Sequence, residues 1–517
     1  MSKPWMIMAV ALAVVLGLAA RVPQGINSDQ ASQLRAVRQY VAGQSPTLNS
    51  VIEPDLRDLS RDRTIWIISR PPAPQLAMYP LLAAGLSSGL TVRILAVLCL
   101  LLGSAGWLRW FERFDMPRWV HYGVAAALPF LHEASNSLYT FSQDTLSYAV
   151  APWVLLLTLS SQRRRGFLVG LVLGFTYIVK YSLIFLGFGA LVWLLWRRRS
   201  PWLVVGCAIP LLALSVLNAH YGPAVNSFFA LAGYYPRWGS LATLIADPAL
   251  AVTDGESLIR TLLHTGSQFL PAYLALVPGL AFLWLTAYGA RLPEVRALDA
   301  AQLALVAFVT TLIVMAAVWT FSYFAADTTA RHVAPASLAV LPVVVLGAAQ
   351  VWRRHGLAIR AALAGLAFVV IVGPLLYGAL ALVAKAGRVP PTYHLGPSAL
   401  LNPYLATWPA LPDLASVEHT IIDQFGPVTD VWYCDYPIAP LDLPGRVWGD
   451  VDERYVPPVF RSSKPLRITA LILTRDETHG GGTAIRARFQ GAGPWTRTVI
   501  AGANVTAWTT VLEPTGP

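Results

Sequence analysis

Residues 166–196, GFLVGLVLGFTYIVKYSLIFLGFGALVWLLW, are apolar along almost their whole length, and an arginine triplet stands directly before and directly after them. As one helix this segment would be about 46 Å long and would place the two triplets on opposite sides of a bilayer. Arginine and lysine collect in cytoplasmic loops, so one triplet would then lie on the wrong side. The segment therefore predicts a helical hairpin with Lys180, Tyr181 and Ser182 at its apex.

The two limbs of this hairpin, 166–180 and 182–196, are short for membrane crossings. Each limb would reach roughly 22 Å, whereas the hydrocarbon core of a bilayer is about 30 Å thick. We therefore expect the apex to lie below the outer surface of the membrane. A lysine at that depth is costly unless it faces protein, water or an anion, which makes Lys180 a candidate functional residue. The alternative is that its ammonium group extends to the surface.

The composition of the whole chain is that of a polytopic membrane protein. Hydrophobic residues make up 56% of the 517 residues and charged residues 13%, which leaves too little polar surface for a soluble globule of this size. The net charge of +11 comes largely from basic clusters between apolar segments, where they indicate membrane topology and not binding to nucleic acid. The chain has three cysteines, and two of them lie in apolar segments, so neither a disulfide framework nor a cysteine metal site is expected.

The basic clusters also predict the sidedness of the other apolar segments. With these clusters in the cytoplasm, the chain is an all-α polytopic protein of the inner (plasma) membrane with about eleven transmembrane helices, a cytoplasmic N-terminus and an extracytoplasmic C-terminus. The first apolar segment is interpreted as an uncleaved span, with a cleavable signal peptide as the alternative. The expected crossings are 5–20, 90–110, 118–134, 144–160, 166–180, 182–196, 201–218, 268–290, 301–321, 332–351 and 357–384.

The composition changes near Arg388, where prolines become dense and apolar runs become short. We therefore divide the chain into a transmembrane domain, 1–387, and a small extracytoplasmic β-rich domain, 388–517. Strands are predicted for PLRITALILTR, AIRARFQ, TRTVIAG and VTAWTTVLE, and a turn for ETHGGGTA.

Ionisable residues that are unusual in a membrane protein gather on the outer side of this topology. They come from separate segments but share one membrane depth, and charges kept at such positions usually have a function. They are Asp29, Arg70, His132, Glu133, Asp144, Lys180, Arg331 and His332.

Five motifs occur in order over about residues 5–350: NSDQ, SRPPAPQLAMYPLLAAGLSSGLTVRIL, TFSQDTLSYAV, LGFTYIVKYS and TARHVAPASLAV. In order and spacing they resemble the lipid-linked-sugar glycosyltransferases of the GT-C fold, especially the branch of protein O-mannosyltransferases and aminoarabinose transferases. Two positions depart from that pattern. Ser32 stands where some relatives have arginine, and Arg70 stands where lysine precedes the double proline.

The resemblance implies transfer of a sugar from a polyprenyl-phosphate donor to a hydroxyl of a glycan, lipid or protein on the outer face, with inversion. In that family an aspartate of the first outer loop is the base, which would be Asp29. Displacing a phosphate from an anomeric carbon requires a carboxylate near the acceptor hydroxyl and positive charge near the departing phosphate. Lys180, Arg331 and Arg70 would hold the phosphate. Asp144 would orient the acceptor or the partners of Asp29, or would join Asp29 in binding Mg²⁺ or Mn²⁺.

Each assignment has a structural alternative. Asp29 and Asp144 could instead begin helices, whose N-terminal ends favour acids. Arg331 could anchor its helix at the membrane interface, and the aromatic patch GYYPRWG at 233–239 could belong to an interfacial belt. A metal site is not expected near the second outer loop, since its candidate ligands His132 and Glu133 are adjacent and would point in different directions on a helix. Candidate substrate-binding residues are His132, Glu133, Tyr139 and His332.

Two other functions fit the same sequence pattern. A transporter or flippase also keeps charges within its spans, although such proteins tend to have internal repeats and helices broken near the midplane. A polysaccharide polymerase or ligase would differ from the first hypothesis mainly in its donor.

Overall fold

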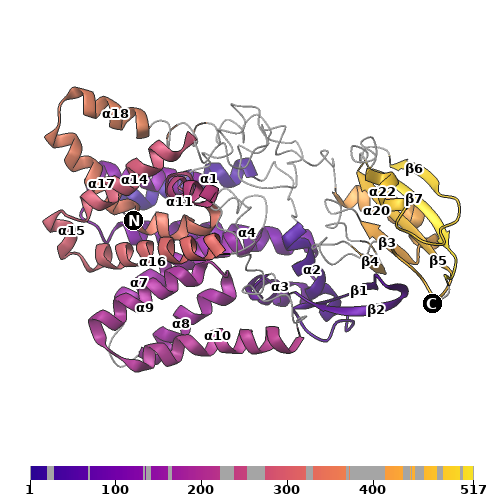
Figure 1. Cartoon of the computed structure of the whole chain (residues 1–517). Helices are drawn as coiled ribbons and strands as arrows, with labels where there is room; N and C mark the ends of the chain where they lie inside the picture. Colours follow the sequence, from indigo (N-terminus) through magenta and orange to yellow (C-terminus); the bar gives the residue numbers. More distant parts are fainter. Residues whose placement is uncertain are drawn as a thin grey trace.

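The computed structural model describes most of the chain as a bundle of helices with a smaller sheet-containing unit at one end (Figure 1). The described residues are 2–19, 28–67, 70–131, 134, 141–160, 166–221, 238–252, 274–321, 330–367, 372, 376, 414–434, 443, 445–448, 459–473, 481–500 and 505–515.

Every predicted crossing has a helix at its place. Four of the described helices are long and apolar enough to cross a membrane, namely Ser88–Phe111, Pro201–Tyr221, Asp299–Ala317 and Arg331–Arg354. The count of eleven crossings stays a prediction. The helices of the bundle are α1 (Lys3–Ala19), α4 (Ser88–Phe111), α5 (Arg118–Ala127), α7 (Gln143–Ser160), α8 (Gly166–Val179), α9 (Leu183–Arg198), α10 (Pro201–Tyr221), α14 (Leu276–Gly289), α16 (Asp299–Phe321), α17 (Ala330–Arg354) and α18 (Leu357–Ala367).

The helical hairpin predicted for 166–196 is confirmed. Helix α8 ends at Val179, α9 begins at Leu183, and the two helices pack against each other. Helix α8 also packs on α10 with the two backbones in contact, because a Cβ atom at Gly170 would lie 2.3 Å from the Leu203 carbonyl oxygen. Small residues permit this close approach between membrane helices.

Contacts at the two ends of the bundle agree with the predicted alternation of helix direction. At one end, Trp5 of α1 donates to Glu112 just after α4 (Nε1–Oε1 2.8 Å), and Arg197 of α9 pairs with Asp299 of α16. At the opposite end, Asn218 of α10 accepts a hydrogen bond from a tryptophan of the first predicted outer loop. Which end faces the cytoplasm stays a prediction.

The first predicted outer loop, 21–89, is more structured than the sequence suggested. It contains α2 (Ser28–Val41), which was expected, and also an antiparallel hairpin of β1 (Ser50–Asp55) and β2 (Asp58–Trp66), followed by α3 (Ala73–Ala83). The hairpin was not predicted. Further along the chain lie α11 (Trp238–Leu250), also unpredicted, and the short α15 (Pro293–Ala297).

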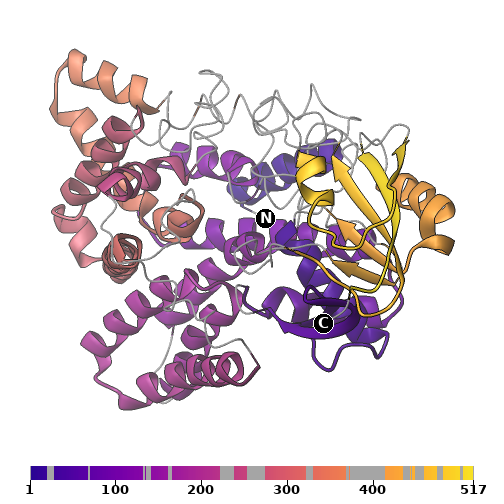
Figure 2. The ribbon, with the colours of Figure 1, turned by 45° about the vertical axis from the view of Figure 1, so that its right-hand side comes forward.

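The C-terminal residues form a five-stranded mixed sheet in the order β4-β3-β5-β7-β6. Helix α20 covers one face through Ile421 and Phe425, and the tip of the β1–β2 hairpin contributes Leu56 and Leu59 to the other face. Figure 2 shows the hairpin beside the sheet. Strands β3 and β4 are parallel, as are β3 and β5, and the other neighbours are antiparallel. The elements are α20 (Leu414–Phe425), β3 (Val431–Cys434), β4 (Arg446–Trp448), β5 (Leu466–Leu473), α22 (Gly481–Arg486), β6 (Thr496–Ile500) and β7 (Val505–Leu512).

Three of the four strands predicted in this region are confirmed as β5, β6 and β7. The strand predicted for AIRARFQ is wrong, since its first residues belong to α22. Its apolar residues Ile485 and Phe489 still pack in the same apolar core as the sheet, although neither belongs to one of the five strands. The proposed domain boundary near 387 lies outside the described residues.

Candidate functional site: a buried carboxylate between two cations

The structure brings together three of the residues predicted for the site. Asp144 begins α7, Lys180 lies at the apex between α8 and α9, and Arg331 begins α17. We call Asp144, Lys180 and Arg331 the Asp144 cluster. The side chains of Asp29, His132, Glu133 and Tyr139 lie outside the described part of the structure, and of Asp29 only the place of its backbone, in the first turn of α2, is given.

Asp144 does not cap its helix. The capping hydrogen bonds are made by Ser142, whose Oγ accepts from the Asp144 backbone N–H (3.1 Å), and by Thr145, whose Oγ1 accepts from the Ser142 N–H (2.9 Å). This reciprocal arrangement satisfies free backbone donors of the first turn. The carboxylate of Asp144 is therefore available for other contacts, and its side chain is 14% exposed.

Lys180 is turned into the protein. Its side chain is 3% exposed, and its Nζ forms an ion pair with Asp144 Oδ1 and donates to the backbone carbonyl oxygen of Arg331 (2.6 Å). The hairpin apex is thereby tied to α7 and α17. The ammonium group of Lys180 does not extend to the surface, so the structural alternative for this residue is wrong.

Arg331 is the most accessible member of the Asp144 cluster. Its Nη1 lies 3.8 Å from Asp144 Oδ2, and its side chain is 20% exposed. The next residue, His332, is hydrogen-bonded through Nδ1 to Ser182 Oγ at the apex (3.1 Å), which holds the start of α17 against the hairpin. With two cations and one carboxylate, the cluster is expected to carry one net positive charge, and such a site in a low-dielectric environment attracts an anion.

The Asp144 cluster is a poor fit for a divalent cation. Both carboxylate oxygens of Asp144 already face a positively charged side chain, and a metal ion there would add to that positive charge. In the part of the chain that the structure describes, no group of three or more histidine, cysteine, aspartate or glutamate residues could hold a metal.

Arg70 lies beside α2. It is 6% exposed, and its Nη1 donates to Ser32 Oγ (2.5 Å). Ser32 is three residues after Asp29, so the two residues share one face of the helix. The two positions that depart from the family pattern therefore contact each other, and Arg70 brings positive charge to the face of α2 that carries Asp29.

The start of α2 and the start of α7 belong to the same end of the bundle. Leu34 of α2 is buried in one apolar cluster with Met78 of α3 and with Phe141 and Ala149, which flank the first turns of α7. Asp29 and Asp144 are therefore carried by helices that contribute to one apolar cluster.

Sequence reasoning missed two buried polar features near this end. The first is a chain of side-chain amides in which Gln33 bonds to Gln75 (2.9 Å) and Gln75 to Asn49 (2.7 Å). The second is Asp247, an acid of α11 that is only 3% exposed. Gln75 had a visible signal, because it is a polar residue in the first turn of an otherwise apolar helix.

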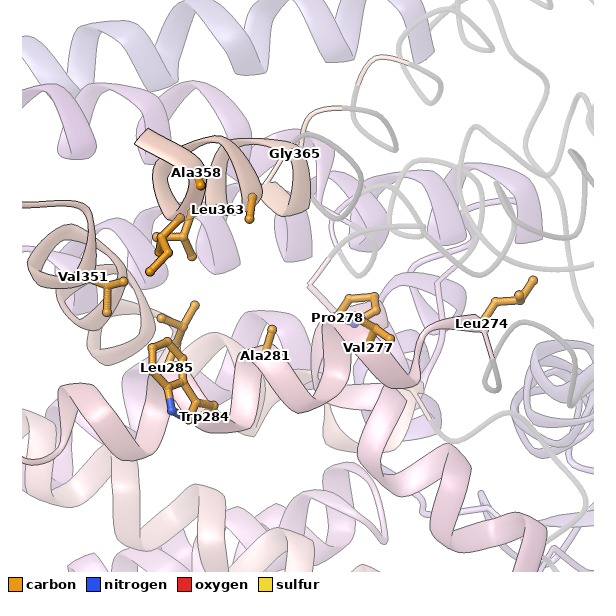
Figure 3. Close-up of a pocket in the computed structure, with 12 residues that line it drawn as sticks. Leu274, Val277, Pro278, Ala281, Trp284, Leu285, Val351, Ala358, Leu363 and Gly365 are labelled. Atoms are coloured by element: carbon orange, nitrogen blue, oxygen red, sulfur yellow. The ribbon is translucent and has the colours of Figure 1, made fainter. Parts of the chain in front are cut away.

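An apolar groove of about 660 Å³ runs between α14 and α18 (Figure 3). Its lining includes Leu274, Val277, Trp284 and Leu363. Ala275, next to Leu274, packs in one apolar cluster with residues that follow Lys180 and Arg331 by a few positions, namely Ile184 and Val333. One end of the groove therefore lies near the Asp144 cluster.

No family model matches the chain, and no curated protein does. Two solved structures of ArnT from Cupriavidus metallidurans are similar to it over nearly the whole length of both chains. The structure bound to undecaprenyl phosphate has 15% sequence identity and a TM-score of 0.51, and the similarity covers 99% of this chain and 98% of that one. The apo structure has 16% identity and a TM-score of 0.54, with 99% of each chain covered. The protein thus shares the GT-C fold of ArnT, and the fold implied by the sequence motifs is confirmed.

Proposed function

We propose that the protein is a membrane glycosyltransferase that moves a sugar from a polyprenyl-phosphate carrier to a hydroxyl group on the outer face of the inner membrane. The observation that carries this proposal is the Asp144 cluster, a largely buried group of two cations and one carboxylate near one end of an apolar groove. The shared fold with a protein solved in complex with undecaprenyl phosphate supports it. The proposed orientation keeps the N-terminus in the cytoplasm and the C-terminal region outside.

The carrier would be recognised by its two chemical parts. The phosphate would contact Arg331, which offers two parallel donors and is partly exposed, and then Lys180 behind it. The isoprenoid chain would lie in the apolar groove along α14, whose Leu274 end is near the cluster. Asp144 would keep both cations in place and limit the charge that they concentrate in the low-dielectric site.

The transfer would be a single displacement. Asp29 would take the proton of the acceptor hydroxyl while the oxygen of that hydroxyl attacks the anomeric carbon. The bond between that carbon and the phosphate oxygen breaks, and the carrier phosphate leaves with its negative charge stabilised by Arg331 and Lys180. One displacement inverts the anomeric centre. Arg70 would orient Asp29 or the acceptor from the neighbouring face of α2, and no step requires a metal ligand from Asp144.

The remaining predicted residues would complete the substrate site. His332 would hold the apex in place through Ser182. The second outer loop would supply His132, Glu133 and Tyr139 for contacts with the sugar or the acceptor, as the sequence suggested.

The proposal is tested by turnover of the purified full-length protein in lipid nanodiscs with a panel of undecaprenyl-phosphate-linked sugars. Release of undecaprenyl phosphate and formation of a labelled product are measured together. We expect Asp29→Asn to lower turnover by about 100-fold or more, the range of general-base catalysis, and Asp29→Glu to retain a part of it. Asp115→Asn, an exposed aspartate outside the proposed site, is the matched control.

Two outcomes would contradict the proposal. Full turnover by Asp29→Asn would remove this residue from the base role. Movement of the lipid-linked sugar across the bilayer without any release of undecaprenyl phosphate would indicate the flippase function instead.

A further inference from the structure

Helix α2, which carries Asp29, is packed on one side against an apolar cluster formed by α3 and α4. Leu34 and Val37 are buried in the apolar cluster that contains Met78 of α3. On the same side, Gln33 donates to the carbonyl oxygen of Pro71 (3.1 Å). These contacts fix the helix axis. Asp29 lies in the first turn of the helix, before the residues that make them.

The other side of α2 is hydrogen-bonded to strand β1. Gln39 donates to the Ile52 carbonyl oxygen (3.0 Å) and accepts from the Ile52 N–H (2.7 Å). Arg35 donates to the same carbonyl oxygen (3.2 Å) and pairs with Glu53 (3.3 Å). Arg35 also donates to the backbone carbonyl oxygen of Val447 in β4, 412 positions later in the chain. Arg35 thus connects α2 directly to the C-terminal sheet.

The β1–β2 hairpin is itself part of the C-terminal unit. Leu56 and Leu59 are 2% exposed and lie in the apolar core beneath the sheet. The Leu59 N–H donates to the Arg461 carbonyl oxygen (2.8 Å), and Arg446 of β4 donates to Asp62 (2.7 Å). The surface to which α2 is bonded is therefore a separate hairpin that packs on the C-terminal sheet, and a shift of that sheet would act on α2 at Arg35.

We propose that Arg35 is a positioning residue through which the C-terminal sheet fixes the placement of Asp29. This inference rests on the proposed function, because the role of Asp29 is assigned there. Arg35 is six residues after Asp29, or about 9 Å along one helix, so a displacement at Arg35 is passed to the first turn. A misplacement of about 1 Å can cost about 100-fold in rate. The carrier is held elsewhere, at the Asp144 cluster, so its binding does not depend on Arg35.

The test compares Arg35→Met, which keeps an apolar stem and loses all five N–H donors, with Arg35→Lys and the control Arg57→Met. Arg57 is exposed at the tip of the same hairpin. With the undecaprenyl-phosphate sugar that wild type uses, we expect Arg35→Met to lower kcat by tenfold or more while the KM for the donor stays within about twofold. Arg35→Lys should recover part of kcat, and Arg57→Met should behave as wild type.

Hydrogen–deuterium exchange of the full-length protein in nanodiscs provides a readout that needs no turnover. In Arg35→Met we expect faster exchange in peptides from 28–41 and from 446–448, with unchanged exchange in 331–354. Unchanged exchange in 28–41, a kcat equal to that of Arg57→Met, or faster exchange throughout the bundle would each overturn the positioning role. If wild type shows no transfer with any donor, the proposed function fails, while the exchange result still decides whether Arg35 links the two units.

Discussion

At the scale of single residues, the central feature is one carboxylate shared by two cations. Removing Asp144 would leave Lys180 almost fully buried with an uncompensated positive charge beside a second one. Breaking a buried ion pair from one side costs far more than the pair contributes as a whole, because the remaining charge stays desolvated.

We therefore expect Asp144→Asn to lower the free energy of unfolding by about 3 kcal/mol. The measurement is thermal unfolding of the purified protein in detergent, followed by intrinsic tryptophan fluorescence, with Asp115→Asn as the control. A Tm equal to that of the control would mean that Asp144 does not stabilise the buried charges of Lys180 and Arg331.

Single residues also show what the sequence could and could not predict. Lys180 and Arg331 were found because a basic residue in or next to an apolar span is conspicuous, and the structure brings both to Asp144. Arg70 was grouped with them, yet its described contact is with Ser32 on α2. Arg35 was missed, because an arginine in a polar helix is expected to face solvent and its partner carbonyl lies in a distant strand.

At the scale of elements, the helices of the bundle were predicted better than the structure of residues 21–89. Apolar length and flanking arginines are local signals, and they placed the α8–α9 hairpin correctly. The β1–β2 hairpin has the sequence SVIEPDLRDLSRDRTIW, which is so rich in charged residues that it gives no sign that Leu56 and Leu59 are buried. What buries them is the C-terminal sheet, so no local pattern could have shown that this segment forms a packed hairpin.

The packing of α8 on α10 depends on glycine. A Cβ atom at Gly170 would lie 2.3 Å from the Leu203 carbonyl oxygen, and a backbone atom cannot move aside as a flexible side chain can. We expect Gly170→Ala to separate the two helices and to lower Tm by several degrees, since overpacking typically costs about 1–3 kcal/mol.

Gly123→Ala in α5 is the matched control for this change. Its Cβ atom would meet nothing within 4 Å, and alanine favours helix, so its Tm should be equal to or slightly above that of wild type. Equal Tm values for both variants would contradict the backbone contact between α8 and α10.

At the scale of the whole molecule, the sheet-containing unit is assembled from segments near both ends of the chain. A division of the sequence near residue 387 assigns the β1–β2 hairpin to the transmembrane domain, but Leu56 and Leu59 pack with Trp448 and Ile468 in one apolar core. A change of composition along the sequence cannot show this packing, because the hairpin is buried by a sheet whose residues lie about 400 positions later in the chain.

The junction between hairpin and sheet should be sensitive to acid. Burial raises the pKa of Asp58, but hydrogen bonds from the Ser463 backbone N–H and from the hydroxyls of Ser60 and Ser463 lower it by more, so the pKa is held well below its usual value. A carboxyl with a depressed pKa contributes stability above its unfolded pKa of about 3.9 and loses that contribution as the pH falls through the folded pKa.

We therefore expect the hairpin to loosen from the sheet below about pH 4, seen as faster hydrogen exchange of 58–66 relative to the bundle. Asp58→Asn should reduce this pH dependence, whereas Asp115→Asn should leave it as in wild type. An identical pH dependence in wild type and Asp58→Asn would show that Asp58 does not control the junction.

The most direct measurement is binding of undecaprenyl phosphate by native mass spectrometry. The test variant is the neutral triple change Asp144→Asn, Lys180→Met, Arg331→Met, which removes all three charges together and leaves none of them unpaired. The control is Arg113→Ala with Arg353→Ala, two exposed arginines that lie outside the Asp144 cluster. We predict stoichiometric binding by wild type and control, and at least tenfold weaker binding by the triple variant. Equal binding by all three proteins, with the triple variant folded, would contradict the assignment of the carrier phosphate to the Asp144 cluster.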